Sequence, residues 1–195
     1  MQEYISYKNI QIAFTVEGKG ETIVLLHGFL ESSTIWKNVV SAFKETHQII
    51  AIDLLGHGKT EKLGYIHSME TMAETVHAVL AELKVEKASI IGHSMGGYVA
   101  LAFAEKFPQQ LEKLVLLNSS TVADSEERKE NRDRAKRLVK QNKQAFISMA
   151  IKNLFTDENR NALRTEINAL VEEAVQLPEE YIIASVEGLK NRKGE

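Results

Sequence analysis

The chain has 195 residues, enough for one domain with an insertion and for a sizeable buried core. Its 24 Lys and Arg residues against 27 Asp and Glu give a formal net charge of −3, which argues against nucleic acid or an anionic membrane as a partner. The absence of cysteine excludes disulfides, thiolate chemistry and zinc sites with cysteine ligands. No apolar run approaches the ~20 residues that span a bilayer, and residues 1–4 lack the basic start of a signal peptide, so we expect a cytoplasmic protein.

Short apolar segments in the first 120 residues are typical of strands. Residues 10–16 alternate loosely and end at the turn of residues 18–20 (Gly-Lys-Gly), as expected of a hairpin strand. Four further runs are mostly continuous in apolar residues, which predicts strands buried on both faces, as in a parallel sheet. These runs are residues 22–26, 48–52, 88–91 and 114–117.

Helical patterns lie between these strands, at residues 32–43, 68–83 and 95–107. The third is rich in alanine and apolar on nearly all sides, so we expect it close against the sheet, and Pro108 ends it. Strands that alternate with helices imply right-handed crossovers and helices on both faces. The predicted fold class is therefore α/β, with a mostly parallel, doubly wound sheet.

The pattern changes after Ser120, because no strand-like run follows as far as Leu189. Residues 124–143 carry dense charge of both signs, which favours a solvated helix over a nucleic-acid surface. Helical patterns continue through residues 145–155, 158–177 and 178–189. We therefore expect a core at residues 1–120 and a helical cap or lid at residues 121–190.

The sharpest chemical signal is Gly92-His93-Ser94-Met95-Gly96, placed directly between a predicted strand and the alanine-rich helix. The G-x-S-x-G pattern alone is weak, and its plain interpretation is a glycine-rich turn with a capping serine, but this context is that of a nucleophile elbow. Such a turn strains the backbone of Ser94, and the two glycines avoid collisions of side chains. The Ser94 hydroxyl would then stand at the carboxyl edge of the sheet, above a helix N-terminus whose N–H groups favour an oxyanion.

Two further glycine-containing segments follow predicted strands. In the first, residues 25–30 (LLHGFL), Gly28 allows a tight turn that presents the Phe29 N–H, which with the Met95 N–H would make a two-donor oxyanion hole. We interpret His27 there as a structural hydrogen-bonding residue rather than a base. The second, residues 53–60 (DLLGHGKT), lacks the spacing of a phosphate-binding loop, so we expect a structural turn.

Together the three motifs resemble those of the α/β-hydrolase superfamily, in order and at similar spacing between about residues 4 and 120, and the following helices resemble the cap of that family. The resemblance implies that Ser94 is the nucleophile and that Phe29 and Met95 supply the oxyanion donors. The implied chemistry is acyl transfer to water, in which Ser94 attacks an ester carbonyl, an acyl-enzyme forms, and water releases the acid.

The sequence departs from this family at the base and the acid. A serine hydroxyl needs a base at neutral pH, and the order in the family is Ser, then Asp or Glu, then His. The last histidine here is His93, which is adjacent to Ser94 and therefore badly aimed. His27 and His57 lie on loops at the same edge of the sheet and are the alternative bases. Asn118 stands near a position where some members carry the acid, but an amide cannot stabilise an imidazolium.

Three explanations for the missing groups stay open: a fragment of a longer enzyme, a natural short form that borrows the remainder or only binds ligands, or an unusual internal base. In the family, further core strands follow the cap, and this chain lacks them at its C-terminal end. The strand at residues 114–117 would then be an exposed apolar edge, so we expect self-association by edge pairing or by exchange of cap helices. The remaining histidines are expected at the surface: His47, His67 and His77.

For the parent protein we expect a small-molecule carboxylic-ester hydrolase. Apolar residues around the serine, Phe29, Leu30 and Met95, favour an apolar acyl or alcohol group. The alternatives are a C–C lyase similar to the menaquinone-pathway synthase, C–C hydrolases, or enol-lactonases on the same fold, and a non-catalytic ligand-binding homologue. The sequence shows no cofactor motif and no plausible metal cluster, so no cofactor is expected.

Overall fold

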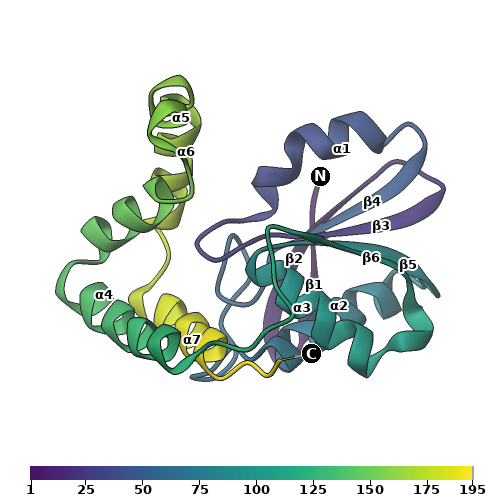
Figure 1. Cartoon of the computed structure of the whole chain (residues 1–195). Coiled ribbons are helices and arrows are strands. Elements are labelled where there is room, and N and C mark those ends of the chain that lie inside the picture. The colour runs from purple at the N-terminus through teal and green to yellow at the C-terminus, as the bar shows by residue number, and fades with distance from the viewer. Residues whose placement is uncertain (195) are drawn as a thin grey trace.

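A six-stranded sheet forms the centre of the computed structural model, which describes residues 1–194 (Figure 1). The strands lie in the order β1-β2-β4-β3-β5-β6. Strands β3 to β6 pair in parallel, whereas β1 and β2 are antiparallel to their neighbours. The bounds are β1 (Gln2–Tyr7), β2 (Ile10–Glu17), β3 (Glu21–Leu26), β4 (His47–Ile52), β5 (Ala88–His93) and β6 (Leu111–Leu117). The predicted fold class, a mostly parallel α/β sheet, is confirmed.

Helices cover both faces of this sheet, with α1 on one face and α2 and α3 on the other (Figure 1). Successive residues of a strand point to opposite faces, so Leu25 packs with Trp36 on the α1 side, while Val24 packs with Met72 on the other. The bounds are η1 (Ser33–Trp36), α1 (Lys37–Phe43), α2 (Met69–Glu82), α3 (Met95–Lys106) and η2 (Pro108–Gln110). Both faces of the central strands are therefore buried, as their apolar runs predict.

The N-terminal hairpin differs from the sequence prediction. Strand β1, which the pattern does not reveal, pairs with β2 across Lys8 and Asn9, both at positive φ (48° and 66°). Two such residues are typical of a tight hairpin turn whose twist matches that of the strands. Beyond the turn of residues 18–20, β2 pairs with β4 rather than with the next strand in sequence. The expected hairpin at that turn is thus absent, because β4 lies between β2 and β3.

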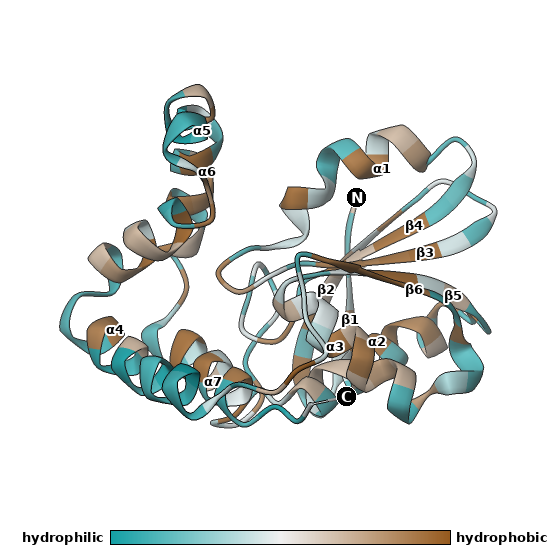
Figure 2. Ribbon diagram, viewed as in Figure 1, coloured by the Kyte–Doolittle hydropathy of each residue, from teal (hydrophilic) through white to brown (hydrophobic). Residues whose placement is uncertain are grey.

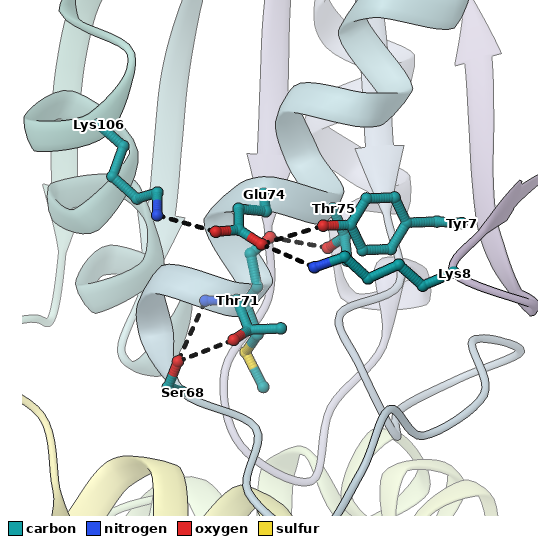
Figure 3. A network of polar contacts seen from close by, with 8 residues as sticks. Tyr7, Lys8, Ser68, Thr71, Glu74, Thr75 and Lys106 are labelled. Atoms are coloured by element: carbon teal, nitrogen blue, oxygen red, sulfur yellow. Dashed lines mark hydrogen bonds and ion pairs between the residues drawn. The ribbon is translucent and has the colours of Figure 1, made fainter.

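Glu74 of α2 joins this hairpin to two helices (Figure 3). Its carboxylate accepts hydrogen bonds from the Tyr7 hydroxyl at 3.0 Å and from Lys8 Nζ at 3.2 Å, and its other oxygen accepts from Lys106 Nζ of α3 at 2.8 Å. The bond from Lys106 is the main reason why the pKa of Glu74 is lowered from 4.5 to about 2. One partly exposed carboxylate therefore links β1, α2 and α3.

Replacing Glu74 by Gln should lower the free energy of unfolding at neutral pH by roughly 1 kcal/mol, because a partly exposed charge network is lost. The folded carboxyl has the lower pKa, so this stabilisation is present above pH 4.5 and disappears as the pH falls toward about 2. Urea unfolding of both proteins at neutral pH and near pH 3 measures the difference. A difference that stays constant over this range would contradict the assigned role of the charge.

The C-terminal part of the chain is helical and stands apart from the sheet, except where α7 approaches the core (Figure 1). Its bounds are α4 (Glu126–Lys152), α5 (Asp157–Ala162), α6 (Arg164–Ala174) and α7 (Glu179–Lys190).

Within α4, Asn142 leaves the helical conformation (φ −158°, ψ 86°), close to the expected break between residues 143 and 145. Figure 2 shows the first half of α4 as largely hydrophilic. Apolar residues of α4, such as Val139 and Ile147, pack instead with Ile167 of α6 and Ile182 of α7. No helix among residues 1–194 is long and apolar enough to cross a membrane.

His67 lies in the contact between the core and α7 and is fully buried. Its Nε2 accepts the Leu63 N–H at 3.3 Å, and its Nδ1 lies 3.0 Å from the Ser185 hydroxyl, which itself donates to the Tyr181 carbonyl. These partners require the neutral ring with the proton on Nδ1, and burial lowers its pKa to about 4. The expectation that His67 lies at the surface is wrong, because α7 covers the loop that carries it.

His67→Gln should make the chain less sensitive to acid. A buried neutral histidine loses stability when the pH falls below its ordinary pKa of 6.5 toward the folded value of about 4, since the unfolded chain binds the proton more tightly. Between neutral pH and about pH 5 this amounts to roughly 2 kcal/mol of unfolding free energy, which the variant should not lose. Urea titrations at both pH values test this, with His47→Gln, at a partly exposed site, as the matched control. Equal acid sensitivity of the two variants would disprove the assignment.

Strand β6 lies at the edge of the sheet and pairs with β5 on one side. Val115 and Leu117 are 47% and 44% exposed. The burial on both faces expected for residues 114–117 is therefore wrong, because Val115 and Leu117 lie on one face of this edge strand and stay partly exposed there.

Candidate active site

Ser94 stands at the sharp turn between β5 and α3, with φ 50° and ψ −113°. This conformation is rare for a residue with a side chain and costs on the order of 1–3 kcal/mol. Three hydrogen bonds hold it. The Ser94 N–H donates to the Leu117 carbonyl at 3.0 Å, and the Ser94 carbonyl accepts from the Gly97 N–H at 3.0 Å and from the Ser119 hydroxyl at 2.8 Å. The surrounding structure therefore imposes the strain, and the Ser94 side chain is left at the tip of the turn.

The two glycines of the motif allow close backbone contacts. A Cβ at Gly92 would overlap the Gly96 carbonyl, and a Cβ at Gly96 would overlap the Leu26 carbonyl of β3. Any other residue at either position would push the elbow away from the sheet. Sequence analysis missed a third glycine of this kind, Gly97, whose Cβ would overlap the Ser119 side chain.

The turn after β3 lies beside the elbow. The Gly28 N–H donates to Glu31 Oε2 at 2.6 Å, and the Gly28 carbonyl accepts from the Glu31 N–H at 3.3 Å. Leu30 has φ 64°, which completes the tight turn. The N–H groups of Phe29 and Met95 have no acceptor among residues 1–194. Both amides therefore remain available to a ligand.

Glu31, which sequence analysis missed, connects this turn to the elbow. The same Oε2 that accepts the Gly28 N–H lies 2.8 Å from His93 Nδ1, and the Glu31 side chain is only 7% exposed. The bond to Glu31 raises the pKa of His93 above 6.5. A carboxylate in an otherwise apolar turn, three residues after Gly28, is the signal that could have pointed to it.

The other two histidines at this edge of the sheet are structural. His27 Nδ1 lies 2.7 Å from the Gly28 carbonyl, and its Nε2 accepts the Leu54 N–H at 2.9 Å, so both ring nitrogens are occupied. His57 contacts the Leu55 carbonyl through Nδ1 at 3.0 Å. Both rings are fully buried, and burial lowers the pKa of His27 and brings that of His57 to about 3. His57 Nε2 is buried without a hydrogen-bond partner among residues 1–194, and no imidazole of these residues is hydrogen-bonded to the Ser94 hydroxyl.

The segment at residues 53–60 is a structural loop. Asp53, 2% exposed, accepts the Ser33 N–H at 2.8 Å and the Lys59 N–H at 2.9 Å through its two carboxylate oxygens. The Thr60 hydroxyl donates to the Asp53 carbonyl at 2.6 Å. The Asp53 carboxylate therefore holds the backbone at Ser33 and Lys59, as expected of a structural turn.

A cavity of about 180 Å³ lies over Ser94. It is formed between the part of the chain that contains the sheet, here called the core, and the helical part with α4 to α7, here called the cap. The core contributes Gly28, Phe29, Leu30, Glu31, His93, Ser94, Met95 and Tyr98. The cap contributes Arg132, Ala150, Ile151, Leu154 and Leu189. In the part of the chain that the structure describes, no group of three or more His, Asp or Glu side chains could hold a metal ion. Most of the predicted site residues thus line one cavity. Gly92 and Gly96 do not line it, but they allow the close backbone contacts that position the elbow.

Residues 21–176 match the family model of the alpha/beta hydrolase fold. This match covers more than half of the chain, so the chain belongs to the alpha/beta hydrolase fold family. A thermophilic esterase from Thermogutta terrifontis, whose structure has malate bound, is similar over 100% of this chain and 74% of its own, with a TM-score of 0.91 and 29% identity.

Two curated relatives carry different activities in their names. The cis-3-alkyl-4-alkyloxetan-2-one decarboxylase of Shewanella oneidensis is 31% identical over 122 residues, which cover 60% of this chain and 38% of that protein. The 2-hydroxy-6-oxononadienedioate/2-hydroxy-6-oxononatrienedioate hydrolase of Paraburkholderia phymatum is 28% identical over 196 residues, which cover 94% of this chain and 62% of that protein. The chain therefore spans less than two thirds of the length of these relatives.

Glu31→Ala should destabilise the chain by about 1–3 kcal/mol, because the Gly28 N–H and the His93 ring would lose their buried acceptor. Glu31→Gln keeps an amide oxygen for the Gly28 N–H and should recover part of this loss. Denaturant unfolding of both variants measures the effect. Two variants as stable as the original chain would show that the bridge contributes nothing.

Proposed function

We propose that this chain is the nucleophile-bearing part of a serine hydrolase that cleaves a small carboxylic ester. The observation that carries the proposal is the strained position of Ser94 in one cavity with the free N–H groups of Phe29 and Met95. Helix α3 begins at Met95, so its positive N-terminal end also faces the cavity. Membership of the alpha/beta hydrolase fold family supports hydrolysis in general.

In the proposed reaction, the Ser94 oxygen attacks the ester carbonyl while a base accepts its proton. The carbonyl oxygen becomes an oxyanion, which the N–H groups of Phe29 and Met95 stabilise. Collapse of this intermediate expels the alcohol, which takes up a proton, and leaves the acyl group on Ser94. Water then attacks the acyl-enzyme, the acid leaves, and the Ser94 hydroxyl is restored.

The base and its acid partner are proposed to come from outside residues 1–194. His27 is unsuited, because backbone groups occupy both of its ring nitrogens. His57 is unsuited because its ring is fully buried and burial lowers its pKa to about 3. His93 is bound to Glu31 rather than to Ser94. The greater length of the curated relatives supports a source in a longer protein, and a second chain is the alternative.

A C–C bond hydrolase is the second candidate. The relative from Paraburkholderia phymatum, which matches 94% of this chain, is named a hydrolase of 2-hydroxy-6-oxononadienedioate and 2-hydroxy-6-oxononatrienedioate. These names describe keto diacids without an ester, so their hydrolysis would have to break a C–C bond. The same serine and oxyanion donors would serve, since both reactions place negative charge on a carbonyl oxygen. The apolar residues Phe29, Leu30 and Met95 would contact the acyl group in either case.

A fluorophosphonate probe tests the nucleophile. In the complete gene product we expect one label at Ser94, lost in Ser94→Ala and kept in the matched control Ser120→Ala, together with a fall in ester hydrolysis of roughly 10³-fold or more in Ser94→Ala. Failure of the complete gene product to label would overturn the proposal in favour of ligand binding without catalysis. Turnover of a C–C substrate rather than esters would select the second candidate.

We also propose that the 195-residue chain self-associates through the exposed edge of β6. Unpaired strand edges with apolar side chains pair readily with other chains. Val115→Lys together with Leu117→Lys should shift the population to monomer, whereas Val122→Lys, at a residue that is 68% exposed outside the sheet, should not. Sedimentation velocity measures the distribution, and a monodisperse monomer of the unmodified chain would refute the idea.

A further inference from the structure

Three charged residues meet where the cap joins the core. Asp124 is fully buried, and its two oxygens accept from Arg132 Nε at 3.0 Å and from Arg192 at 3.1 Å. A buried carboxylate needs such partners, because removing it from water is costly. Two guanidinium groups against one carboxylate leave the cluster with a net positive charge.

The two arginines of this cluster differ in their surroundings. Arg192 has a side chain that is 3% exposed and lies over the Tyr98 ring, 3.8 Å from its centre. Arg132 has a side chain that is 27% exposed and lines the cavity above Ser94. Its bond to Asp124 uses Nε, and its two terminal nitrogens have no acceptor among residues 1–194. Arg132 therefore offers free donors on an anchored side chain.

The other charged groups of the cavity are already paired. Glu31 is bound to the Gly28 N–H and to His93, whose pKa is raised by that bond. Among the charged residues that line the cavity and that the structure describes, Arg132 is thus the one whose side chain still has free N–H donors for a ligand. The wall next to it is apolar and includes Ile151 and Leu154 of the same helix.

We propose that Arg132 binds a free carboxylate of the substrate, so that the substrate class is a small ester or related acyl compound that also carries an acid group. The planar guanidinium matches a carboxylate with two parallel hydrogen bonds, and the bond to Asp124 holds it in place before the ligand arrives. The cavity of about 180 Å³ that also contains Ser94 has room for a ligand of a few carbon atoms. That this carboxylate belongs to a substrate rests on the proposed function, whereas the binding of a carboxylate by Arg132 does not.

Succinate is the probe for this site, because its binding needs no reaction at Ser94. We expect saturable binding by calorimetry, roughly tenfold or more weaker in Arg132→Gln. The matched control is Arg134→Gln, which removes the same charge from an exposed position on α4. No detectable binding to the unmodified chain, equal binding by Arg132→Gln, or preference for the neutral dimethyl ester would each overturn the proposal.

A second measurement does not depend on the folding of a variant. Succinate should protect Arg132, but not Arg134, from phenylglyoxal in the unmodified chain, as read by mass spectrometry of peptides. Equal modification of Arg132 with and without succinate would overturn the site. Fluorophosphonate labelling measures the serine chemistry and succinate binding measures the carboxylate site, so a failure of one and a failure of the other are separate results.

Discussion

The close backbone contact between the elbow and β3 is the constraint on which the site depends. Gly96 lies against the Leu26 carbonyl, and Gly92 lies against Gly96 itself, at distances that no side chain allows. This contact fixes the start of α3 beside the turn that follows β3. Only then do the N–H groups of Met95 and Phe29 share one cavity with Ser94. The strain at Ser94 is the cost of this arrangement, and the bonds to Leu117, Gly97 and Ser119 offset it.

The Glu31 carboxylate provides a second link between the elbow and the turn that follows β3. Through one oxygen, Glu31 accepts from the Gly28 N–H in the turn after β3 and contacts His93 of the elbow. The turn and the elbow are far apart in the sequence, so a bond between their ends restricts their relative motion. The bond between Glu31 and His93 raises the pKa of His93, so the ring partly offsets the carboxylate charge beside the proposed oxyanion hole.

Sequence patterns gave the central strands, the cap helices and the elbow, because each depends on local periodicity or on glycine at fixed spacing. The break in α4 near Asn142 also followed from the local pattern. The position of β4 between β2 and β3 was not visible, since this pairing joins segments that are distant in the chain. Strand β1 was missed for another reason: it has no continuous apolar run, and none of its residues is fully buried. The burial of His67 depends on α7, more than a hundred residues later, and no local signal reports it.

The residues that sequence analysis missed at the site share one property. Glu31 and Arg132 acquire their roles through partners on other elements, His93 and Asp124 respectively. A sequence motif consists of residues that are close together in the chain. It therefore identifies Ser94 and the flanking glycines, but not the charged residues Glu31 and Arg132 that lie near Ser94 in the folded structure. Even His93, which the motif includes, has its pKa set by a group 62 residues earlier.

The ion cluster of Asp124, Arg132 and Arg192 joins the ends of the cap, and one of its members, Arg132, also lines the cavity. Asp124 precedes α4 and Arg192 follows α7, so the pair at 3.1 Å joins the two ends of the cap beside the core. Loss of either arginine would leave the buried carboxylate with one partner, which is strongly unfavourable in a site with little water. The Nε of Arg132 donates to Asp124, whereas its terminal nitrogens have no acceptor among residues 1–194. The proposed carboxylate contact would therefore use donor atoms that the contact with Asp124 does not use.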